Sequence, residues 1–219
     1  LYIVFAFGYL LNSYCDRSLD LQVDKDQYLG FSDASVKMAL FVLGILSVIF
    51  PFIFQSKLII LITIFGLLLS LSYSAPPLRL KEKGLLGLCV AAISQRLVFL
   101  FLVVIVPGQF LLVLYLFGWL SILGIFPELG HQFSDAEEDQ KLNMQTFIVK
   151  AGFKSGKHLF EFLLKILGIY ILLPILSLSI YGISLSILLF IFSHNTLAYA
   201  YDCYVQQRED VTKNESIEE

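Results

Sequence analysis

Long apolar blocks alternate with short polar segments along the whole chain. Seven mainly apolar stretches lie at residues 1–14, 38–55, 57–74, 85–106, 108–127, 158–178 and 182–201. Most approach or reach the roughly 17–25 residues that a helix needs to cross a bilayer. The pattern predicts an all-α integral membrane protein, a multi-helix transmembrane bundle with seven spans in this chain. The sequence begins inside an apolar run without Met, so we expect it to be truncated at the N-terminus.

Composition and charge agree with this class. Hydrophobic residues make up 58% of the chain and charged residues 15%, against about 45–50% and 25% in soluble domains. No basic stripe suggests nucleic acid as a partner. We expect a transmembrane domain at 1–205 and a polar, disordered cytoplasmic tail at 206–219.

Positive residues fall in alternate loops, after the first, third and fifth apolar stretches and in the tail. Because cytoplasmic loops carry the excess of Lys and Arg, these loops are predicted to face the cytoplasm. Both clusters of candidate functional residues described below fall in the same loops, so we expect the active site on that face.

The first candidate cluster ends the first apolar stretch. Asn12, Asp16 and Asp20 repeat every four residues, which places them along one face of a helix. Carboxylates in so apolar a chain cost free energy, so a pair of them indicates a functional site. The alternative is a helix end with ordinary surface charge.

The second cluster follows the fifth apolar stretch. Glu128, Asp135 and Asp139 are spaced by seven and four residues, so on one continuous helix they lie within about 40° of one another. Oxygen ligands without thiolate or a second imidazole favour Mg²⁺ or Ca²⁺ over zinc. His131 is interpreted as a polar helix-end residue rather than a ligand.

Between the clusters runs the segment Tyr73-Ser-Ala-Pro-Pro-Leu-Arg79-Leu-Lys81. Its two prolines are expected to end the preceding helix. Arg79 and Lys81 are then either membrane-surface anchors or, beside the acidic clusters, groups that neutralise a diphosphate.

Together the N-x-x-x-D-x-x-x-D helix end, the Tyr-Ser-x-Pro-Pro-x-Arg-x-Lys loop and the D-x-x-x-D helix end resemble the UbiA family of intramembrane prenyltransferases. The resemblance covers roughly residues 1–205 and implies a bundle of about nine helices in the full fold. It implies Mg²⁺ held by the two aspartate motifs, which in turn bind an isoprenyl diphosphate. The partners it implies are that diphosphate, a lipophilic or aromatic acceptor and the lipid bilayer.

The resemblance also assigns roles by position. The implied catalytic residues are Asp16, Asp20, Asp135 and Asp139. The implied metal ligands are Asn12, Asp16, Asp20, Glu128, Asp135 and Asp139. The implied substrate-binding residues are Asn12, Arg17, Lys25, Tyr73, Arg79, Lys81 and Lys141.

Three positions depart from the family pattern. Ser13 stands where Asp is usual, Asn143 replaces a common Gly, and Lys25 is the only cation in an acid-rich loop after Asp20.

The alternatives to a prenyltransferase are a relative that binds isoprenoids without catalysis and a cation transporter. Helix-end acids argue against transport, because transport sites gather near the midplane. The sequence selects neither an acceptor nor a prenyl chain length.

Overall fold

The computed structural model describes residues 2–21, 31–106, 108–177 and 179–215, all in helices and connecting turns. The chain divides into two compact units, Leu1–Phe117 and Gly118–Glu219. Each unit is described by itself below.

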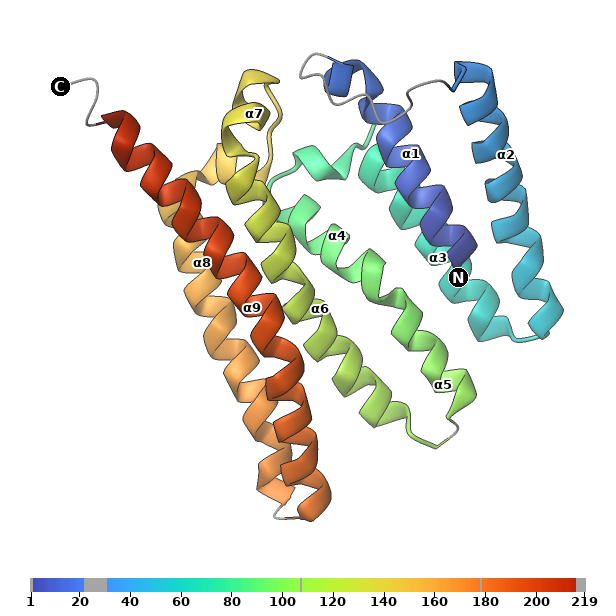
Figure 1. Cartoon of the computed structure of the whole chain (residues 1–219). Helices are drawn as coiled ribbons and strands as arrows, with labels where there is room; N and C mark the ends of the chain where they lie inside the picture. The colour runs from blue at the N-terminus through green and yellow to red at the C-terminus, as the bar shows by residue number, and fades with distance from the viewer. Residues whose placement is uncertain (1, 22–30, 107, 178, 216–219) are drawn as a thin grey trace. The chain divides into compact units, whose positions relative to one another are not determined.

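The first unit is built from helices that pack against one another (Figure 1). Helix α1, Tyr2–Asp20, packs against both α2 and α3. Helix α2 spans Asp33–Ile49 and continues as the 3₁₀ helix η2, Phe50–Phe54. Helix α3 spans Lys57–Ser74. It ends directly before Pro76-Pro77, as the prolines predict.

A short 3₁₀ helix, η3 at Leu80–Glu82, leads into α4 at Leu85–Arg96. The apolar stretch 85–106 was predicted as one span, but it is divided into α4, η4 at Leu97–Phe101 and α5 at Leu102–Ile105. The division follows Arg96, whose guanidinium donates a hydrogen bond to the side-chain oxygen Oε1 of the neighbouring Gln95. A polar pair thus lies where the regular α-helix stops.

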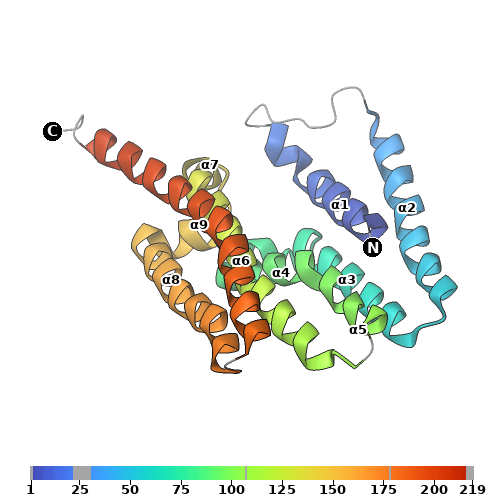
Figure 2. The same cartoon turned by 60° about the horizontal axis from the view of Figure 1, so that its bottom comes forward.

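The second unit contains most of α6, which spans Phe110–Ser134, and the short α7 at Ala136–Lys141. Helix α8 spans Phe147–Leu172, continues as η5 at Leu173–Ser177, and lies beside α9, Ile180–Glu215, in both views (Figures 1 and 2). Gly152 interrupts α8 with a φ of 82°. Glycine populates this region without the Cβ penalty that other residues meet, so α8 bends there.

Aromatic residues fill the core of the second unit. Phe126 and Phe133 of α6 are fully buried. Phe126 packs edge-on against Phe160 of α8, and Phe133 contacts Phe153 of α8 and Tyr204 of α9. These contacts join α6, α8 and α9 into one core.

The all-α membrane class is confirmed. Helical segments occupy all seven predicted stretches, and five helices within the described residues are long and apolar enough to cross a membrane. Leu85–Phe101 is a shorter apolar helix. In the five long helices between 11% and 33% of the most apolar window is buried, so most of their apolar side chains face outward, as lipid contact requires.

The tail differs from its prediction. The backbone of α9 continues through the polar residues to Glu215, so the expectation of disorder from residue 206 was wrong for 206–215. Residues 216–219 lie outside the described part. A helix already stabilised by packing in its apolar half can propagate into a polar segment, because adding a residue to a formed helix is far easier than nucleating one.

Candidate active site

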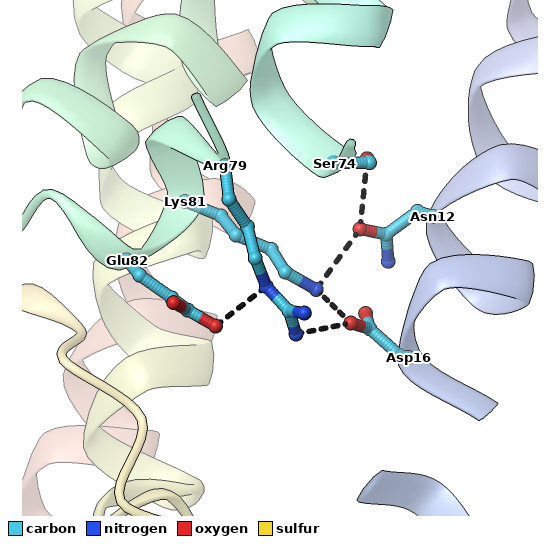
Figure 3. Close-up of polar contacts among 6 residues, drawn as sticks. All are labelled: Asn12, Asp16, Ser74, Arg79, Lys81 and Glu82. Atoms are coloured by element: carbon cyan, nitrogen blue, oxygen red, sulfur yellow. Dashed lines mark hydrogen bonds and ion pairs between the residues drawn. The ribbon is translucent and has the colours of Figure 1, made fainter. Parts of the chain in front are cut away.

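One polar cluster joins the end of α1 to the segment that follows α3, within the first unit (Figure 3). We call it the α1–η3 cluster. Its members are Asn12, Asp16, Ser74, Arg79, Lys81 and Glu82. Four of these residues were named or quoted in the sequence motifs as candidates, and the structure brings them together across more than 60 positions of chain.

Asp16 is the centre of the cluster. Its Oδ1 accepts a hydrogen bond of 3.0 Å from Nη2 of Arg79 and a second from Nζ of Lys81. The three side chains are 13%, 22% and 7% exposed. Because water is largely excluded, these ion pairs are screened less than surface pairs. Two cations thus converge on one carboxylate.

Asn12 lies one helical turn before Asp16. Its Oδ1 accepts a hydrogen bond of 3.0 Å from Oγ of the buried Ser74 and lies 3.4 Å from Nζ of Lys81. The two donors fix the direction of the amide, with its oxygen toward Ser74 and Lys81 (Figure 3).

The loop itself is held in an unusual conformation. Arg79 has a φ of 40° in the left-handed region, which is uncommon for a residue other than glycine. Its Nε forms an ion pair with Oε1 of Glu82 at 2.6 Å. Behind the loop, Gly87 lets α4 approach: a Cβ added there would lie 2.5 Å from Leu80 O and 2.8 Å from Lys81 O. The backbone of Lys81 is therefore set by close packing.

Other candidates of the first motif and of the segment 73–81 lie elsewhere or outside the described residues. Arg17 forms an ion pair of 2.9 Å with Asp33 of α2. Tyr73 is half-buried in the last turn of α3. Asp20 ends α1, its side chain lies outside the described part, and Lys25 lies wholly outside it.

The second motif belongs to the second unit, and one of its predictions was wrong. The single helix expected through 128–139 is divided at Asp135, which lies between α6 and α7 with φ −93° and ψ 1°. Hydrogen bonds from Asp135 N to His131 O and from Asp139 N to Asp135 O bridge the division. Asp tolerates this sparsely populated conformation better than most residues, since its short side chain forms local polar contacts.

Around the division, the acids have different environments. Asp135 is exposed, whereas Asp139 is half-buried and its Oδ2 accepts a hydrogen bond of 2.9 Å from Oγ1 of the buried Thr146. Glu128 is half-buried in α6, and Lys141 is exposed at the end of α7. Thr146 therefore ties the second aspartate of the motif to the start of α8.

Three further positions of this region have a clear structural role. Oε1 of the buried Gln132 accepts a hydrogen bond of 2.9 Å from Phe147 N, a free amide at the start of α8. Asn143 has a φ of 56°, a conformation that Asn and Gly both adopt readily, which explains how Asn stands here where Gly is common. His131 contacts Tyr199 of α9, with 3.2 Å between Nδ1 and the phenol oxygen, as suits a polar helix-end residue.

The donor chemistry of the α1–η3 cluster fits a hard divalent cation. Among the described residues, no three His, Cys, Asp or Glu side chains gather closely enough to hold a metal ion. Asn12 Oδ1 and Asp16 Oδ1 nevertheless converge on one cationic group, Lys81 Nζ. Both are uncharged or anionic oxygens of the kind that Mg²⁺ binds. Two ligands from this cluster therefore suit the metal that the motif implies.

Sequence reasoning missed three residues that organise these sites: Glu82, Thr146 and Gln132. Glu82 follows Arg79 by three positions in the sequence, which was a usable signal. Thr146 and Gln132 gave no signal, because their partners depend on the path of the chain between α7 and α8.

Comparison with known proteins gives one match. The model of the UbiA prenyltransferase family matches residues 1–216, nearly the whole chain. Neither the curated proteins nor the solved structures gave a match. The match agrees with the resemblance of the three motifs, two of which supply the α1–η3 cluster. The chain therefore belongs to the UbiA prenyltransferase family.

Proposed function

We propose that this protein transfers an isoprenyl group from an allylic isoprenyl diphosphate to a lipophilic or aromatic acceptor, with Mg²⁺ as cofactor, at the cytoplasmic face of a membrane. The observation that carries the proposal is the convergence of Asp16 and Asn12 with Arg79 and Lys81. Hard oxygen ligands and two fixed cations at one place are what a metal-bound diphosphate requires.

The reaction breaks the bond between the first isoprenyl carbon and the diphosphate oxygen. The electron pair leaves with the diphosphate, and the allylic cation then bonds to the acceptor, which loses a proton when it is an aromatic carbon. Arg79 and Lys81 would bind the departing diphosphate in a site that excludes much of the water, where such contacts are stronger than in solution. Bound Mg²⁺ supplies further neutralisation of the same charge.

Asn12 and Asp16 would hold the metal within the first unit, and Glu82 would keep the Arg79 guanidinium in place. The remaining assignments rest on the motifs. They assign further metal ligands to each unit by itself: Asp20 in the first, and Glu128, Asp135 and Asp139 in the second. Arg17, Lys25, Tyr73 and Lys141 would contact the substrate. Apolar helices would provide the environment for the isoprenyl tail.

The test is diphosphate release by the full chain in detergent from geranyl, farnesyl and geranylgeranyl diphosphates, with Mg²⁺ and with EDTA. Candidate acceptors of the quinone-ring and polar-lipid classes are supplied in turn. We expect metal-dependent release, reduced by about 10²–10³-fold in Asp16→Ala and Asp135→Ala, the loss typical for one electrostatic contact to a transition state. Glu161→Ala, which removes an exposed acid of α8, is the matched control.

Metal-independent release, or equal rates in the two variants and the control, would contradict the proposal. Binding of the isoprenyl diphosphate with no diphosphate release in the presence of any acceptor would instead indicate a relative that binds isoprenoids without catalysis.

A further inference from the structure

Lys81 occupies an unexpected position for a residue that binds substrate. Its ammonium group lies between Asn12 Oδ1, 3.4 Å away, and Asp16 Oδ1, with which it forms an ion pair (Figure 3). The side chain is only 7% exposed, so this is an internal contact. Both oxygens belong to residues that the first motif assigns to the metal. The two oxygens that contact Lys81 are therefore the same ones that would bind a divalent cation.

The two shared oxygens already accept hydrogen bonds that a metal ion would have to replace. A carbonyl oxygen has two lone pairs, and on Asn12 one of them accepts from Ser74 Oγ, which leaves the other to Lys81. On Asp16 the same Oδ1 accepts from both Arg79 and Lys81. A metal ion that binds these atoms must displace a cationic group or lie against it, at a cost in like-charge repulsion.

The two cations differ in how firmly they are fixed. Arg79 also pairs with Glu82 at 2.6 Å, and its planar guanidinium has a fixed set of donors. Within the described part of the chain, Lys81 pairs with Asn12 and Asp16, the two proposed metal ligands, and its ammonium sits on a flexible four-carbon side chain. Lys81 is therefore the group that can exchange partners without loss of another ion pair.

We propose that Lys81 is an internal counter-ion that competes with the divalent cation for Asn12 and Asp16 and moves to the diphosphate when metal and diphosphate bind together. The second half rests on the proposed function, whereas the first concerns the metal alone. It follows that metal binds weakly without diphosphate and that each ligand strengthens binding of the other, since such coupling is reciprocal.

Two binding measurements on the full chain in detergent test this. The first titrates Mn²⁺, followed by its free electron paramagnetic resonance signal and displaced by Mg²⁺, in the absence of diphosphate. The second measures farnesyl diphosphate binding at saturating Mg²⁺. We expect Lys81→Met to bind Mn²⁺ about tenfold more tightly than the unmodified protein, roughly the effect of one partly buried charge pair. We expect its diphosphate affinity to fall by about 10- to 100-fold, as for loss of a charged hydrogen bond.

Two variants serve as controls. Lys83→Met removes the same charge from an exposed position two residues away, and both affinities should change by less than about threefold. Lys81→Arg keeps the positive charge, so its Mn²⁺ affinity should stay close to that of the unmodified protein. Lys81→Gln, which keeps a polar group of similar length, replaces Lys81→Met if the latter fails to fold.

The opposite signs of the two changes separate exchange from a structural role. If Lys81→Met and Lys81→Gln both weaken Mn²⁺ and diphosphate binding, or if Mn²⁺ affinity is unchanged, the counter-ion proposal is overturned. If the variants bind Mn²⁺ more tightly but no form binds farnesyl diphosphate, competition for the metal ligands is supported and the proposed transferase function fails.

Discussion

Replacement of Gly87 by alanine tests whether close packing of α4 sets the position of Lys81. The added Cβ would lie 2.5 Å from Leu80 O, 2.8 Å from Lys81 O and 2.9 Å from Lys81 Cα. All three are backbone atoms, so none can move aside by a side-chain rotation. Ordinary contact begins at 3.4 Å, and the η3 backbone must therefore shift by roughly 0.9 Å to accept the methyl group.

The magnitude follows from that shift. Overpacking of this kind lowers the free energy of unfolding by about 1–3 kcal/mol. Displacement of a binding group by about 1 Å costs up to 10²-fold in rate. We expect Gly87→Ala to show both effects, with diphosphate affinity falling clearly more than in the Lys83→Met control and more than stability alone explains.

The assay is thermal or denaturant unfolding in detergent together with farnesyl diphosphate binding at saturating Mg²⁺. The matched control is Gly168→Ala in α8, where an added Cβ has nothing within 4 Å. It should be neutral or more stable by about 0.5–1 kcal/mol, because alanine favours helix over glycine. If Gly87→Ala is as stable as this control and binds diphosphate normally, the packing argument is refuted.

Two further predictions concern hydrogen bonds at the motifs. Ser74→Ala removes the donor to Asn12 Oδ1 and should lower stability by about 1 kcal/mol and weaken Mn²⁺ binding several-fold. Ser72→Ala removes a hydroxyl that donates to Leu68 O within its own helix; it should leave Mn²⁺ binding unchanged and is the control. Thr146→Val removes the donor to Asp139 Oδ2 at constant shape and should lower the unfolding free energy by about 1 kcal/mol. An unfolding midpoint equal to that of the unmodified protein would contradict that contact.

Most helices could be predicted from the sequence because each depends on local information. The long apolar runs predict α2, α3, α6 and α9, and Pro76-Pro77 sets the end of α3 to within two residues. Proline removes a donor and clashes with the preceding turn, so no tertiary contact is needed to predict this boundary.

The helix boundaries that the sequence did not predict depend on residues whose effect varies with their structural context. Asp135 divides a segment whose acids keep a helical period, and only its backbone angles reveal the division. Gly152 interrupts α8, although isolated glycines elsewhere, such as Gly168, continue a helix. The tail helix beyond residue 206 was missed because composition describes a segment alone, whereas α9 had already been nucleated by its apolar half.

Within the candidate site, the sequence predicted the members of the first cluster but not their partners. The sequence predicted Asp16, Arg79 and Lys81 on one side of the membrane. It assigned them separate roles, Asp16 as a metal ligand and the two cations as ligands of the diphosphate. The structure shows that the two groups bind each other, through Asp16 Oδ1. Which side chains pair depends on their distance in the folded protein. The pattern of charges along the chain does not predict that distance.

This pairing also gives a physical reason for the proposed metal requirement. Within the α1–η3 cluster the charges of Asp16 and Glu82 balance those of Arg79 and Lys81. A diphosphate brings several negative charges, and in a half-buried site it can attract the two cations only by competing with carboxylates that stay behind. Under the proposed function, a divalent cation held at Asp16 would remove that competition, because it would neutralise the carboxylate and release the lysine. Besides binding phosphate oxygens, the metal would then make the positive charge of Lys81 available to the diphosphate.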